Sequence, residues 1–172
     1  MAQDIYLKRI PKLDRPVEEM LRIHQSIDQL ATNDLSVLKS LHPTDVLERL
    51  RTVGTPGIIE RKTLAETLGY WSNDVALATW VRHRFGNKEG QRHHVTKDVM
   101  DDLLDTMRRV LDRRDPAYAA EHLPETVPFN LNGRKPYDLS YFSELRDSHI
   151  QLLTACIRTD VDTDYLIVEL FG

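Results

Sequence analysis

The side chains of this sequence that could carry out chemistry are a few histidines, one cysteine and a row of carboxylates. His83, His93 and His94 suggest a metal site, but adjacent histidines in an extended segment point to opposite faces, so we expect no metal there. Cys156 stands in an apolar helical run. A thiol in that setting is neither exposed nor of low pKa, so it is a poor nucleophile. A single cysteine also excludes paired-cysteine zinc spacing.

The carboxylates fall on one side of a segment that follows Thr96, and they could bind a divalent cation; they are Asp98, Asp101, Asp102 and Asp105. Arg108 and Arg109 follow one turn later. Acidic residues near a helix start and basic residues near its end are what the helix dipole favours, so we predict a solvated face. His149 with Asp138 or Asp147 could form an acid–base pair, but a core histidine is favoured. The sequence therefore predicts no cofactor and no catalytic residue.

Aromatic residues gather in the segment that runs from Leu68 to Phe85, which holds both tryptophans. Ser72, Asn73 and Asp74 are good N-cap types, so a helix is predicted over 74–85, with Gly86 ending it. Apolar residues on every side of this helix indicate burial with elements packed all around it. The aromatic residues Tyr70, Trp71 and Trp80 are then either core or the walls of a pocket.

The flanking segments predict how this helix is enclosed. Residues 3–9 and 165–171 read as strands that pair into a two-stranded ribbon. Helices are predicted after Asp14, after Thr96, over 115–122 and over 138–157, and the last of these has an inner face made of Leu139, Phe142, Leu145, Leu152 and Cys156. Residues 63–68 are expected to form a helical turn and residues 86–94 a polar loop. We predict a mainly helical α+β fold with a central buried helix surrounded by helices and a small sheet of N- and C-terminal strands.

Composition indicates one soluble globular domain over residues 1–172, at 41% apolar and 29% charged residues. Within it we expect a helical insertion or subdomain over 14–60 and a core over 61–172. The net charge of −4 argues against a general nucleic-acid binder. Because the chain has one cysteine, no leader-like apolar region and no membrane-spanning run, a cytoplasmic location is expected.

Three segments in order resemble a family of small uncharacterised proteins of phages and bacteria, with motifs of the form GLDMYL, YWRKAN followed by IH and WF, and LLP leading to GFFFG. The first segment keeps Asp4, Tyr6 and Leu7. The middle one keeps Tyr70, Trp71, an aliphatic Leu77 and Trp80. The late one runs from Leu123 to Gly133 and is followed by Tyr137, Asp138 and Tyr141. The resemblance spans most of the chain except residues 14–60.

The chain departs from that family at its polar positions. The Arg, Lys, Asn and His of the family's middle motif fall here on Ser72, Asn73, Val75 and Ala78, and the late aromatic run is reduced to Phe129. The resemblance therefore implies the apolar frame of the fold and a phage-type origin, but no activity.

These observations favour a non-enzymatic binding protein that contacts a host protein or sequesters a small ligand in the host cytoplasm. The long irregular segment 124–136 supports this reading, because such loops are often functional. The alternative is a small hydrolase or transferase with its site near Trp80, His83 and residues 124–136. A homodimer through a free apolar helix face stays open. The residues predicted to bind the ligand or partner are Asp4, Tyr6, Tyr70, Trp71, Trp80, His83, Pro124, Phe129, Tyr137 and Tyr141.

Overall fold

The computed structural model describes residues 4–12, 14–22, 66–72, 74–86, 91–124 and 137–171. The described strands are β1 (Asp4–Pro11), β2 (Glu66–Ser72), β3 (Arg92–Val95) and β4 (Asp164–Phe171). The described helices are α5 (Val75–Phe85), α6 (Lys97–Arg113), α7 (Pro116–His122) and α8 (Leu139–Ile157), and residues 17–22 are also helical. The fold is α+β, as the sequence predicts.

The strands form one antiparallel sheet in the order β2-β1-β4-β3. The two terminal strands are its centre, because β1 pairs with β4 along its whole length, from Asp4 opposite Phe171 to Pro11 opposite Asp164. The predicted pairing of the chain ends is therefore confirmed. The sheet is larger than the predicted ribbon, since β2 and β3 extend it on either side.

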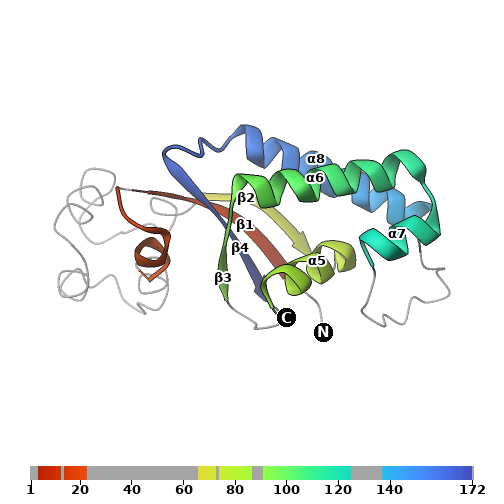
Figure 1. Ribbon diagram of the computed structural model, residues 1–172, viewed down its shortest axis with the longest axis horizontal. Coiled ribbons are helices and arrows are strands. Elements are labelled where there is room, and N and C mark those ends of the chain that lie inside the picture. Colours follow the sequence, from red (N-terminus) through yellow and green to blue (C-terminus); the bar gives the residue numbers. More distant parts are fainter. Residues whose placement is uncertain are drawn as a thin grey trace.

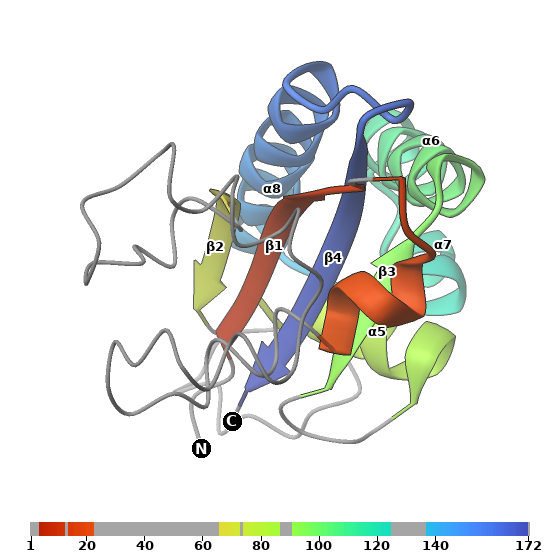
Figure 2. The ribbon, with the colours of Figure 1, turned by 90° about the vertical axis from the view of Figure 1, so that its left-hand side faces the viewer.

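The helices α5, α6, α7 and α8 lie on one face of this sheet (Figures 1 and 2). Alternate strand residues point toward them, and the buried ones that do so are Ile5, Leu7, Trp71, Val95, Leu166, Val168 and Leu170. The long helices α6 and α8 pack against each other over the sheet. On the opposite side Ile10 and Ile167 are also buried, and the helical residues 17–22 lie in front of that face (Figure 2). The core is thus a sheet–helix interface.

Capping side chains set the starts of α5, α6, α7 and α8. Asp74 accepts from the Leu77 amide at 2.9 Å, and Thr96 accepts from the Val99 amide at 3.4 Å. The carboxylates of Asp115 and Asp138 cap α7 and α8 in the same way. Side-chain oxygens at these positions satisfy amides that the first helical turn leaves without partners. The predicted starts of α5, α6, α7 and α8 are therefore confirmed.

Two predictions of local structure are wrong. The segment predicted as a helical turn over 63–68 is β2 from Glu66 on, and β3 replaces the last part of the polar loop predicted over 86–94. In both segments, pairing with a distant strand decides the conformation. Among the described strands, β2 pairs with β1 alone and β3 with β4 alone. Long-range pairing of this kind overrides weak local preferences.

Helix α5 does not lie at the centre of a helical bundle. Its buried residues are Ala76, Leu77, Ala78, Thr79 and Val81, whereas His83 and Arg84 in its last turn are exposed. Because Ala76 to Thr79 are four consecutive buried residues, the first turn of α5 is covered on all sides, whereas its last turn reaches solvent. Leu139, predicted on the inner face of α8, is 83% exposed because it stands in the first turn, while Phe142, Leu145 and Leu152 are buried as predicted. Of the helical insertion or subdomain predicted over 14–60, residues 23–60 lie outside the described residues.

Candidate functional site

The structure brings three of the predicted binding residues together on the sheet face that points away from α6 and α8. Tyr6 lies opposite Tyr70 in the β1–β2 register, and their rings are 4.9 Å apart between centroids. The Tyr70 hydroxyl donates to Asp4 Oδ1 at 3.0 Å, and Phe171 of β4 contacts Tyr6 edge-on at 5.8 Å. Tyr70 is 49% exposed. The result is a small surface cluster of rings.

The tryptophans lie elsewhere. Trp71 follows Tyr70 in a strand, so its side chain points to the opposite face, where it is buried in the core. Trp80 is half-buried against Phe85, and His83 is exposed. Trp71 and Trp80 border a core cavity of about 10 Å³, which is at most the size of one water molecule. The structure therefore separates Tyr70 from the tryptophans and leaves no ligand-sized space between Trp71 and Trp80.

The late predicted residues hold α7 against the start of α8. Tyr141 is buried and its hydroxyl donates to the Leu123 carbonyl at 3.2 Å. Tyr137 contacts the Tyr141 ring edge-on at 4.9 Å. Pro124 follows this contact directly, and Phe129 lies outside the described residues. The described geometry gives this group a structural role.

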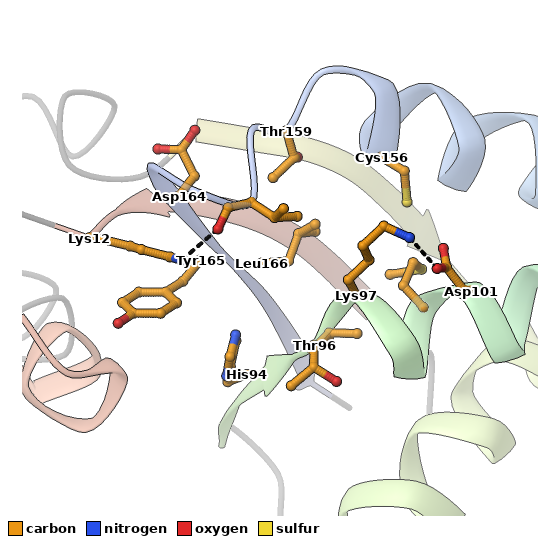
Figure 3. Close-up of a pocket in the computed structure, with 13 residues that line it drawn as sticks. Lys12, His94, Thr96, Lys97, Asp101, Cys156, Thr159, Asp164, Tyr165 and Leu166 are labelled. Carbon is orange, nitrogen blue, oxygen red and sulfur yellow. Dashed lines mark hydrogen bonds and ion pairs between the residues drawn. The ribbon is translucent and has the colours of Figure 1, made fainter.

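A different place offers a cavity of ligand size. A pocket of about 380 Å³ opens where β1 ends, β3 leads into α6, and the turn after α8 leads into β4 (Figure 3). Small-molecule pockets span roughly 300–1000 Å³, so the volume suits a small ligand. It is lined by Lys12, His94, Val95, Thr96, Lys97, Met100, Asp101, Cys156, Thr159, Val161, Asp164, Tyr165 and Leu166. None of the nine described residues that were predicted to bind lines it.

The inner wall of the pocket is apolar. Val95, Met100 and Leu166 are buried core residues that also face the cavity. They are held there by the fold, because Val95 pairs with Leu166 across β3 and β4, and Thr96 starts α6 immediately afterwards. The pocket wall is therefore as rigid as the sheet itself.

Charged and polar groups surround this apolar wall. The Lys12 ammonium donates to the Val161 carbonyl at 2.5 Å and lies 5.1 Å from the centre of the Tyr165 ring. The Tyr165 hydroxyl donates to the Arg15 carbonyl at 2.7 Å, which fixes the ring. On the other side of the pocket Lys97 forms an ion pair with Asp101, one helical turn along α6 (Figure 3).

The two groups in the pocket that could react are both uncharged near neutral pH. Burial lowers the pKa of His94 and the positive charge of Lys12 lowers it further, while the negative charge of Glu18 opposes this shift without reversing it. Burial raises the pKa of the Cys156 thiol, and Asp101 adds to that effect. His94 and His93 point to opposite faces, as predicted, since His93 stacks on Phe85 and His94 contacts Tyr165. Among the described residues, no three His, Cys, Asp or Glu side chains group to hold a metal ion.

The sequence held little signal for this pocket. His94, Asp101 and Cys156 stand out as reactive types, yet their segments lie far apart in the chain and meet only through the sheet. Residues 92–95 form a strand that places His94 beside β4 and the start of α6. A loop over 86–94, as the sequence predicts, does not bring His94 near these elements.

No family model, curated protein or solved structure matches this chain. No described helix is long and apolar enough to cross a membrane. The geometry of the pocket is therefore the basis for assigning a function.

Proposed function

We propose that this chain is a non-enzymatic binding protein that sequesters a small ligand in the pocket bordered by α6, α8 and β4. The observation that carries the proposal is a cavity of about 380 Å³ with buried apolar residues on its inner wall and polar groups around them. An apolar wall with a few fixed polar groups is the usual make-up of a small-molecule site. The polar groups would orient the ligand while the apolar wall supplies affinity.

The chemistry of the pocket favours binding over catalysis. A nucleophilic thiol needs a lowered pKa, whereas burial raises that of Cys156. Within the described residues no hydrogen bond joins Cys156 to a base. The alternative site of a hydrolase or transferase, near Trp80, His83 and residues 124–136, gains no support from its described part, because Trp80 packs on Phe85 and His83 is exposed at the end of α5. Residues 125–136 lie outside the described residues.

The family resemblance supplies the biological setting of the proposal. A phage-encoded protein of this kind would act in the host cytoplasm by lowering the free concentration of its ligand. Binding without turnover suits that role, since one bound molecule per chain suffices when the protein is abundant. Sequestration of a small ligand is preferred here to capture of a host protein because the described cavity has the size of a small molecule.

Native mass spectrometry of the chain purified from cells tests the proposal. Val161 lines the pocket mouth and is 43% exposed, so Val161→Trp should fill the cavity without disturbing the core. Ile157→Trp is the matched control, because Ile157 is 84% exposed and does not line the pocket. We expect a bound small molecule in wild type and Ile157→Trp, and none in Val161→Trp.

Alkylation of Cys156, the chain's one cysteine, gives a second readout of the same site. An occupied pocket should slow the reaction of this thiol with iodoacetamide in the folded protein. The proposal is wrong if Val161→Trp keeps the bound species, or if wild type carries none and a library of small molecules neither raises its melting temperature nor protects Cys156.

A further inference from the structure

The charges around the pocket are unequal at its two ends. Lys97 is neutralised by Asp101, its ion-pair partner in α6. Lys12 has no such partner within the described part of the chain, since its ammonium meets only the Val161 carbonyl and the face of the Tyr165 ring. Asp164 also lines the pocket, but its carboxylate lies 4.0 Å from Arg9. One uncompensated positive charge therefore faces the cavity at the Lys12 end.

The remaining polar group at that end can donate a hydrogen bond. His94 contacts the edge of the Tyr165 ring, with ring centroids 5.1 Å apart, and lines the same side of the cavity as Lys12 (Figure 3). Leu166 lies between this end and the end that holds Lys97, Asp101 and Cys156 (Figure 3). A neutral imidazole offers one N–H donor, which an anion accepts. The pocket thus has an anion-compatible end and an apolar middle.

We infer that the ligand is a monoanionic amphiphile, a carboxylic acid with an apolar body. Its carboxylate lies against Lys12 and His94, and its body covers Leu166 and Met100 and reaches toward Cys156. A single uncompensated ammonium matches a single negative charge, since Lys97 and Asp101 neutralise each other and Asp164 lies beside Arg9. This inference rests on the proposed function, because it names the chemical class that the pocket sequesters.

The test compares three probes of equal chain length, namely octanoate, octanol and octylamine, by calorimetry on the full chain freed of any bound ligand. We expect octanoate to bind most tightly and to protect Cys156 from alkylation. Lys12→Met should weaken octanoate binding about tenfold or more, as expected for a charge-assisted hydrogen bond, and leave octanol unchanged. Lys12→Arg should keep the preference for the anion.

Two controls separate the pocket from general effects. Arg109→Met removes one exposed positive charge from α6 at a residue that does not line the pocket, so it should not change octanoate binding. Val161→Trp should abolish binding of all three probes. The Lys12→Arg variant also keeps a donor for the Val161 carbonyl, which guards against loss of the local fold.

The outcomes distinguish this inference from the proposed function. If octanol or octylamine binds as tightly as octanoate and protects Cys156, or if Lys12→Met has no effect, the anion assignment is overturned and the binding function stands. Octanoate binding that survives Val161→Trp also overturns it, since the site then lies elsewhere. If no probe binds and no other small molecule protects Cys156, both fail together.

Discussion

Gly69 is the residue on which the position of Trp71 depends. Both lie on the helix-facing side of β2, two residues apart, and a Cβ added at Gly69 would be 2.3 Å from the Trp71 ring carbon Cη2. The ring is 5% exposed, so it can move away only by displacing its core neighbours. We therefore predict that Gly69→Ala lowers the free energy of unfolding by about 1–3 kcal/mol, measured by urea denaturation.

A double-mutant cycle checks this cause. In a Trp71→Leu background the added methyl group meets a smaller side chain, so Gly69→Ala should cost clearly less than in wild type. Gly86→Ala is the matched control, because Gly86 has φ +98° and nothing within 4 Å of an added Cβ. Its cost of about 1–3 kcal/mol should arise from the backbone alone, because φ 98° with ψ 173° suits only glycine, and should stay the same in both backgrounds. Equal costs of Gly69→Ala in the two backgrounds would contradict the steric account.

Asp74 makes stability depend on pH in an unusual direction for a carboxylate. Burial raises its pKa above the ordinary 3.8, and the hydrogen bonds from Ser148 and the Leu77 amide offset this only in part. The folded state therefore holds the proton more tightly than the unfolded state. Between pH 3.8 and the raised pKa, this group makes the protein less stable as pH rises.

Asp74→Asn tests that sign, because asparagine keeps the cap of α5 and does not titrate. Relative to wild type, the variant should gain stability as pH rises through this interval. The measurement is urea denaturation at a series of pH values at constant ionic strength. Parallel pH profiles for the two proteins would show that Asp74 does not titrate differently on folding.

At the scale of elements, Glu169 joins the three strands β1, β4 and β3. It is 1% exposed, and its carboxylate accepts from Lys8 of β1 and Arg92 of β3, each at 2.6 Å. Burial by itself would raise its pKa, but the two hydrogen bonds and positive charges outweigh burial and lower it. The stability that this group contributes is therefore lost as pH falls below the ordinary pKa of 4.5 and through the lowered one.

We predict that Glu169→Gln lowers the free energy of unfolding by about 3 kcal/mol at neutral pH, because it leaves two partly buried positive charges without their partner. The variant should also lose the dependence on pH below 4.5 that Glu169 causes. Asp105→Asn is the control, since Asp105 pairs with Arg108 and Arg109 on an exposed face and should cost less than about 1 kcal/mol. Equal effects of the two substitutions in denaturation would argue against the role of Glu169.

Elements whose signals are local could be predicted from the sequence. The starts of α5, α6, α7 and α8 follow from single capping residues, and the apolar spacing of α6 marks its buried side. The strands β2 and β3 could not be predicted from the sequence, because their conformation depends on partner strands more than 20 residues away along the chain. The buried cluster around Glu169 gave no signal either, since a single glutamate in an apolar strand is uninformative until its cross-strand neighbours are known.

The candidate site, like the strands, depends on contacts between segments that are far apart in the sequence. Asp4, Tyr6 and Tyr70 stand in two segments that carry the family-like motifs, but only the β1–β2 pairing brings them together, and the sequence did not predict that pairing. The pocket could not be predicted from the sequence, since its lining comes from four separate segments. Aromatic residues in the sequence mark where large side chains are concentrated, but they do not mark the cavity. The cavity lies where β1, β3 and β4 end beside α6 and α8.

At the scale of the whole molecule, both ends of the described chain lie in the middle of the sheet (Figures 1 and 2). Closing this contact joins residues about 160 positions apart, and β4 is the last of the described strands in chain order. Such non-local pairing is slow to form, because the entropy of loop closure is lost before the contacts form. The sheet, and with it the pocket, is complete only when the last strand has inserted between β1 and β3.

This arrangement predicts where the native protein opens least. The residues Leu166 to Glu169 pair with β1 on one side and β3 on the other, and all four are buried. Their amides should exchange with solvent only by global unfolding, so native-state hydrogen exchange should give them the free energy found by urea denaturation. Amides of β2 should exchange faster through local opening, because β2 is paired on one side only among the described strands. Exchange of the β4 amides as fast as those of β2 would show that the paired chain ends are not the most stable part of the fold, and a pocket built on Val95 and Leu166 would then lose its rigid wall.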